Sequence, residues 1–158
     1  MRMSLLAAVF LLALAAVQPL RAEDRHEGYY YPKVGSTEVY EAKVPTAPDS
    51  DRKRRLGFVA GLTKQLAELP YPPQYAIFAK GDEAEKLIVI GYGGGQLATV
   101  YRARATFATL SSLVRLGPLF QGTPIDDQAT FFDFAKLLGF EQITVSDGDT
   151  YAHQIVLK

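Results

Sequence analysis

The sequence predicts an α+β protein with an antiparallel sheet of about five strands and with helices mainly on one face. The β-rich segments come as adjacent pairs joined by short turns that contain Gly and Asp, and not as one strand per helix. Between the pairs lie stretches whose apolar residues recur every three or four positions, as in amphipathic helices. A hydrophobic fraction of 48% with 22% charged residues excludes wholesale disorder. The predicted element order is βαβββααββ.

Residues 1–22 are predicted to be a secretory signal peptide. Arg2 supplies a positive charge, residues 4–17 form an almost unbroken run of apolar side chains, and Ala22 offers a small residue for cleavage. The apolar run is shorter than the roughly 20 residues that a membrane-spanning helix needs. We therefore expect a periplasmic or secreted protein with no stable membrane span after signal cleavage, and an uncleaved anchor is the alternative.

Residues 23–35 are expected to form an extended N-terminal arm, because the segment is polar and then Tyr-rich and contains Pro32. Residues 36–158 then form a single domain. Its first strand is predicted at 37–44, where polar and apolar side chains alternate. A helix follows at 52–69, behind the N-cap candidates Asp49, Ser50 and Asp51. Its expected core face consists of Leu56, Val59, Leu62, Leu66 and Leu69.

The middle of the domain is predicted to be a meander. Two strands at 74–80 and 86–91 flank a turn, and a third strand at 97–104 returns after the glycine run at 91–95. A helix is expected at 105–116, where Phe107, Leu110 and Val114 share one face.

The last part of the chain is predicted to be a helix followed by a closing hairpin. Thr123 at the N-cap, Pro124 and Asp126 mark the start of the helix, and Gly139 marks its end. The hairpin strands are expected at 140–146 and 150–157.

Several catalytic designs are excluded by composition. The absence of Cys excludes disulfides, thiolate zinc sites, iron–sulfur clusters and a Cys nucleophile. His26 and His153 have no second ligand at metal-binding spacing. A Ser nucleophile would have to use His153, and no Gly-x-Ser-x-Gly elbow exists to present it. We therefore predict no catalytic residue, no metal site and no cofactor, and the balanced charge gives no reason to expect nucleic acid as a partner.

The glycine run at 91–95 is the strongest candidate for a phosphate-binding loop. Such a loop needs a Lys-Ser/Thr pair after its last glycine, or spaced glycines that lead into a helix. Here the run leads into the predicted strand at 97–104, and no Lys-Ser/Thr pair follows it. A flexible connection between strands is the favoured interpretation.

Three groups of side chains are predicted to bind a partner. The cations of residues 52–55 begin a helix, where the dipole disfavours positive charge, and their alternative interpretation is a solvated first turn. Arg102 and Arg104 share one face if 97–104 is a strand, and they face either an acid of a neighbouring strand or a bound anion. Tyrosines beside prolines make rigid amphipathic surfaces, or cover a sheet edge. The candidate binding residues are Tyr29, Tyr30, Tyr31, Tyr75, Arg52, Arg54, Arg55, Arg102 and Arg104.

Three runs carry a resemblance to a known family: GYYYP at 28–32, YPPQYAIFAKGDEAEK at 71–86 and LLGFE at 137–141. The chain resembles small exported alphaproteobacterial proteins that are often labelled molybdopterin-guanine dinucleotide biosynthesis protein A, a family without an established activity. The guanylyltransferase of that label opens with a strand, a Leu-Ala-Gly-Gly loop and a nearby Arg-Met-Gly, and this pattern is not present here.

The sequence therefore predicts a non-catalytic exported protein with a binding or accessory role. The expected partner is a periplasmic protein or a small anionic ligand. The alternative is guanylyl transfer in molybdenum-cofactor synthesis, as the family label implies.

Overall fold

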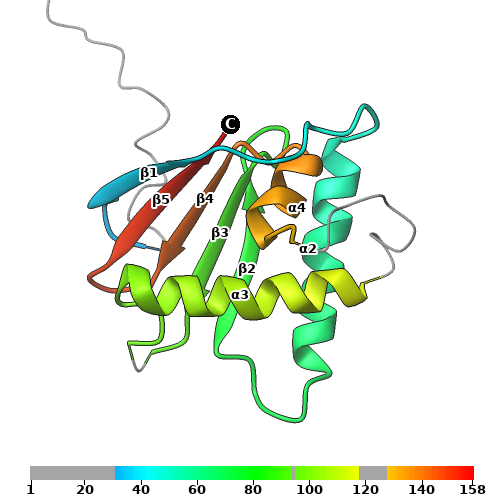
Figure 1. Ribbon diagram of the computed structural model, residues 1–158. Coiled ribbons are helices and arrows are strands. Elements are labelled where there is room, and N and C mark those ends of the chain that lie inside the picture. The colour runs from blue at the N-terminus through cyan, green and yellow to red at the C-terminus, as the bar shows by residue number, and fades with distance from the viewer. Residues whose placement is uncertain (1–30, 94, 118–127) are drawn as a thin grey trace, which may run out of the picture.

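One five-stranded sheet runs through the computed structural model, in the order β1-β5-β4-β3-β2 (Figure 1). The structure describes residues 31–93, 95–117 and 128–158. The strands are β1 (Ser36–Tyr40), β2 (Tyr75–Lys80), β3 (Lys86–Gly91), β4 (Gln142–Ser146) and β5 (Ala152–Leu157). The helices are α2 (Arg52–Ala67), α3 (Val100–Leu116) and α4 (Phe131–Leu137).

The sheet is mixed, so the predicted antiparallel sheet is wrong although the α+β class is confirmed. The two predicted hairpins are present as the antiparallel pairs β2–β3 and β4–β5. However, β3 pairs with β4 in parallel, and β1 pairs with β5 in parallel. A parallel pair needs a long crossover, and the chain between β3 and β4 provides one through α3 and α4.

The predicted strand at 97–104 is also wrong, because α3 begins at Val100 and the described part of the chain has the order βαββααββ. Thr99 is the N-cap, and its hydroxyl oxygen accepts the backbone N–H of Arg102 at 3.3 Å. The buried side chains of the helix follow its 3.6-residue period: Ala103, Phe107, Leu110 and Val114. The helix buries this apolar face against the core, and this burial favours a helix over the strand that the short alternating pattern predicted.

Helix α2 begins where the sequence predicts, and its core face is confirmed in part: Leu62 and Leu66 are buried and Val59 packs against the core. Asp51 caps the helix by accepting the backbone N–H of Arg54 at 2.6 Å. Leu69 is 43% exposed and Leu56 is also exposed, so they do not belong to the core face. The buried positions are Arg55, Phe58, Leu62 and Leu66. Phe58 turns toward the core because it packs against two other aromatic rings. Its ring centroid lies 6.1 Å from that of Phe131 and 6.0 Å from that of Phe140.

Aromatic contacts join the three helices on the same side of the sheet. Phe131 of α4 contacts Phe58 of α2, and its ring centroid lies 5.5 Å from that of Phe107 in α3. Figure 1 shows α3 and α4 in front of the strands. The helices cover Leu87, Val89, Ile143 and Val145, which are fully buried. None of the described helices has the length and apolar character needed to cross a membrane.

Helix α4 begins with Thr130 at the N-cap, which is bonded to Asp133 in the first turn. The N–H and the hydroxyl of Thr130 both donate to the carboxylate of Asp133, at 2.8 and 3.0 Å. The start predicted at Thr123 lies outside the described residues. The predicted stop is confirmed, because Gly139 has a φ of +81° and follows the C-cap of the helix.

Candidate ligand groove between β1 and α3

One end of the sheet brings together polar groups that are distant in sequence. Strands β1 and β5 begin at the end where β3 and β4 finish, because β4 and β5 are antiparallel and β3 and β4 are parallel. The register places Ser36 of β1 directly opposite His153 of β5. Helix α3 starts after the loop that leaves β3 at this end and brings Arg104 to Glu38 of β1.

A chain of four polar side chains crosses this end, and we call it the polar line. The hydroxyl oxygen of Ser36 lies 2.8 Å from Nδ1 of His153. Nε2 of His153 lies 3.5 Å from Oε1 of Glu38, and Oε2 of Glu38 lies 3.5 Å from Nη2 of Arg104. Ser36 and Glu38 are two residues apart on a strand, so both side chains lie on the face that the helices cover.

Two buried polar atoms beside the polar line have no hydrogen-bond partner among the described residues. Nε2 of His153 is one of them, because its 3.5 Å contact with Glu38 is an ion-pair distance without hydrogen-bond geometry. The hydroxyl of Tyr151 is the other, and its ring stacks on His153 at 6.5 Å. Burial raises the pKa of Tyr151, and the negative charges of Glu38 and Asp147 raise it further. Buried polar atoms are rarely left unpaired, which marks this end of the sheet as a candidate site.

A groove runs from the polar line between β1 and α3, with a volume of about 450 Å³. Its floor is aromatic, since the ring centroid of Phe132 lies 4.9 Å from that of Phe107 and 4.8 Å from that of Tyr40. The lining residues are Glu38, Val39, Tyr40, Arg104, Phe107, Ala108, Ser111, Thr130 and Phe132. Small-molecule sites typically enclose about 300–1,000 Å³ of mostly apolar surface with a few polar groups.

The polar groups at the far end of the groove already have partners within the protein. The hydroxyl of Tyr40 donates to Asp133 at 3.1 Å, and the backbone N–H of Lys43 donates to the same carboxylate at 2.8 Å. Burial alone would raise the pKa of Asp133, but these bonds and those from Thr130 outweigh it and lower the pKa. The carboxylate is therefore ionised and satisfied, and among the described lining residues Glu38 and Arg104 are the charged groups that a ligand can reach.

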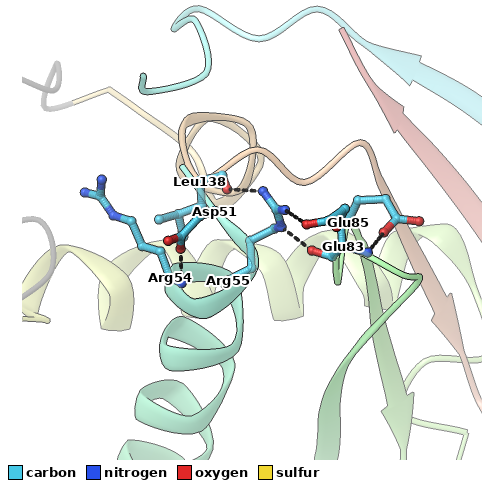
Figure 2. Close-up of polar contacts among 6 residues, drawn as sticks. All are labelled: Asp51, Arg54, Arg55, Glu83, Glu85 and Leu138. Atoms are coloured by element: carbon cyan, nitrogen blue, oxygen red, sulfur yellow. Dashed lines mark hydrogen bonds and ion pairs between the residues drawn. The ribbon is translucent and has the colours of Figure 1, made fainter. Parts of the chain in front are cut away.

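The predicted cluster of cations at 52–55 is divided between the interior and the surface, and Figure 2 shows two of its members, Arg54 and Arg55. Arg55 is 6% exposed, and it donates from Nε to the carbonyl oxygen of Glu83 at 2.8 Å and from Nη1 to that of Leu138 at 3.3 Å. Arg54 forms an ion pair with Asp49. Arg52 is exposed. Arg55 thus joins α2 to two neighbouring segments, and the four cations do not form one surface.

Arg102 and Arg104 do not share a face as predicted, because they lie on a helix. Positions two apart on an α-helix point about 200° apart. Nη1 of Arg102 donates to the carbonyl oxygen of Gly95 at 2.5 Å, whereas Arg104 reaches Glu38. The sequence left open whether Arg104 faces an acid of a neighbouring strand or a bound anion. In the structure Arg104 pairs with an acid of a strand, Glu38 of β1.

The predicted tyrosine surface is described only in part. Tyr29 and Tyr30 lie outside the described residues, and Tyr31 is half-buried. Tyr75 of β2 packs against the core, where burial raises its pKa to about 12. This environment is that of a core-facing side chain and not that of an exposed contact residue.

The prediction that the glycine run at 91–95 leads into a strand is wrong. Gly93 and Gly95 have φ values of +68° and +67°, and the segment leads into α3 and not into a strand. A strand, a glycine-rich loop and a helix therefore do follow one another here. The missing Lys-Ser/Thr pair still distinguishes the segment from a phosphate-binding loop.

The sequence did not single out Ser36, Glu38 or Phe132. The alternation of 37–44 was the available signal, because it places Glu38 and Tyr40 on the same strand face. In the described part of the chain, no group of three or more His, Asp and Glu residues is arranged to hold a metal ion. Comparison with protein-family models, with curated proteins and with solved structures gives no match to this chain.

Proposed function

We propose that this chain is an exported, non-catalytic binding protein, and that the β1–α3 groove holds a small amphipathic molecule with an anionic group. The observation that carries the proposal is the ion pair of Glu38 and Arg104 beside an aromatic groove. The side chain of Arg104 is 68% exposed, so its guanidinium is open to a ligand.

The ion pair between Glu38 and Arg104 within the protein is weak enough for a ligand to replace it. Its atoms are 3.5 Å apart and both side chains are partly exposed, a geometry that typically contributes about 0–1 kcal/mol. A ligand carboxylate can instead form two parallel hydrogen bonds with the guanidinium of Arg104.

The floor of the groove supplies the apolar half of the interaction. Phe107, Ala108 and Phe132 line it, and none of their side chains needs a hydrogen bond. Burial of about 100 Å² of ligand surface there would contribute roughly 2.5 kcal/mol. A ligand with an apolar body and one anionic end uses both halves of the site.

The surroundings of Ser36 support binding without catalysis. Its hydroxyl lies beside His153, but acyl transfer also needs backbone donors aimed at a developing oxyanion. The neighbouring N–H of Gly35 is already used, because it donates to the carbonyl oxygen of Ala152 at 2.9 Å.

The proposal is tested by thermal unfolding with 3-phenylpropionate and with its neutral analogue 3-phenylpropanol. We expect the carboxylate to raise the melting temperature and the alcohol to raise it much less. A ligand at 100 times its Kd adds about 2.7 kcal/mol to the free energy of unfolding. Arg104→Gln should abolish the difference, and the matched control Arg102→Gln, on the same helix but outside the groove, should preserve it. Equal shifts with both compounds, or none, would overturn the proposal.

A second proposal keeps the guanylyl transfer that the family label implies. The observation in its favour is the run of β3, glycines with positive φ and α3, which is the context of many nucleotide sites. Thr99 does not serve as a phosphate ligand here, since it caps the helix. Stabilisation by GTP with Mg²⁺ that is lost in Gly93→Ala would support this second proposal against the first.

A further inference from the structure

A ligand anion on Arg104 leaves Glu38 without its counter-charge. Oε2 of Glu38 faces Nη2 of Arg104 at 3.5 Å, so a carboxylate that takes the guanidinium comes close to this oxygen. The contact with His153 lies on the other carboxylate oxygen, toward the buried side, and does not cover Oε2. Two carboxylates then face each other at the mouth of the groove, which disfavours a purely anionic ligand.

A ligand with a cationic group beside its anion removes this repulsion. The protein offers a negative and a positive group 3.5 Å apart, so the two charged groups of the ligand must also be close neighbours. In an α-amino acid the ammonium and the carboxylate are attached to the same carbon atom. Longer zwitterions separate the two charges by several bonds and match this spacing less well.

The rest of the groove determines which kind of side chain the ligand can carry. The described lining residues beyond Glu38 and Arg104 carry no charge, and the floor is formed by the rings of Phe107 and Phe132. A charged side chain would find no partner there, whereas an apolar one would be buried. The volume of about 450 Å³ accommodates a molecule of this size.

We infer that the ligand of the groove is a free α-amino acid with an apolar side chain, an inference that rests on the binding function proposed above. Arg104 binds its carboxylate, Glu38 binds its ammonium, and the rings of Phe107 and Phe132 contact its side chain. The weak pairing of Glu38 with Arg104 is exchanged for one ion pair of each side chain with the ligand.

Isothermal titration of the unmodified protein with three related compounds tests this inference. L-Phenylalanine carries both charges, 3-phenylpropionate lacks the ammonium, and 2-phenylethylamine lacks the carboxylate. We expect phenylalanine to bind at least ten-fold more tightly than either analogue. Equal affinity for phenylalanine and phenylpropionate would overturn the amino-acid inference and leave the proposed function intact, whereas no binding of any compound would overturn both.

Variants test whether Glu38 binds the ammonium group of the ligand. Glu38→Gln should reduce the affinity for phenylalanine at least ten-fold and raise that for 3-phenylpropionate, because it removes the carboxylate that repels a purely anionic ligand. Glu41→Gln is the matched control, because Glu41 is exposed near the end of β1 and does not line the groove. An equal loss for both compounds in Glu38→Gln would contradict the assignment. The three-compound comparison needs no variant, so it decides the inference even if Glu38→Gln does not fold.

Discussion

Arg55 donates its Nε–H to the carbonyl oxygen of Glu83 at 2.8 Å, which ties the first turn of α2 to the turn between β2 and β3. Figure 2 shows the same guanidinium reaching the carbonyl oxygen of Leu138 at the end of α4. A single side chain thus connects three segments that are distant in sequence. Its guanidinium makes these hydrogen bonds and a 3.8 Å ion pair with the carboxylate of Glu83 within the protein.

Arg55→Ala should therefore destabilise the fold. The substitution leaves two carbonyl oxygens without their donor and removes a buried side chain, so we expect a loss of about 2–3 kcal/mol. The adjacent Arg54→Ala removes only a pair with the exposed Asp49 and should cost about 1 kcal/mol or less. Urea unfolding of both variants provides the measurement, and equal losses would show that Arg55 has no special structural role.

Asp133→Asn should be similarly damaging, because the carboxylate joins the N-terminus of α4 to the end of β1. It accepts from Thr130, Tyr40 and the backbone of Lys43, and an amide group cannot accept all these bonds. We expect a loss of about 2–3 kcal/mol in urea unfolding. Asp149→Asn, at an exposed turn position, is the control and should change stability by less than about 0.5 kcal/mol. A neutral effect of Asp133→Asn would refute this role.

The stability should fall at acid pH through two carboxylates. Burial disfavours the charge of Asp133 and Asp147, but hydrogen bonds outweigh it and lower both pKa values below the ordinary 3.8. A lowered pKa in the folded state means that the contribution is complete above the unfolded value and is lost as pH falls through the folded value. Unfolding free energies measured from pH 6 downward should therefore decrease once the pH falls below the ordinary carboxyl pKa of 3.8. The decrease should be shallower in Asp133→Asn. An unchanged slope in the variant would contradict the assignment.

Export is the proposal with the simplest test. Residues 1–22 have the charge and apolar pattern of a signal peptide, and cleavage after Ala22 leaves Glu23 as the first residue. Mass spectrometry of the protein recovered from its own cells should find this N-terminus in the exported fraction. An intact Met1 on cytoplasmic protein would refute both cleavage and localisation.

Local features of the fold were predictable from the sequence. Both hairpins, the cap at Asp51 and the stop at Gly139 follow from residues close to them in sequence. The parallel pairing of β3 with β4 was not predictable in this way, because it depends on how α3 and α4 pack. Likewise, Phe58 and not Leu56 faces the core because Phe131 and Phe140 lie there.

The candidate site was less accessible to sequence reasoning than the fold. Glu38 and His153 lie near opposite ends of the described chain and meet only because β1 and β5 pair in parallel. Arg104 was predicted as a contact residue, but on a strand, and its contact with Glu38 depends on the start of α3 at Val100. Sequence patterns identify residue types and faces, whereas this site depends on pairing between distant segments.

The central claim is that the β1–α3 groove binds a small amphipathic anion, and an NMR titration tests it most directly. Backbone amide signals of the ¹⁵N-labelled protein would be followed as 3-phenylpropionate is added. We predict saturable shifts at Glu38, Arg104, Ala108 and Ser111, with little change at Arg55, which lies in α2 and does not line the groove. Saturable shifts centred elsewhere, or no shifts at millimolar ligand, would contradict the claim.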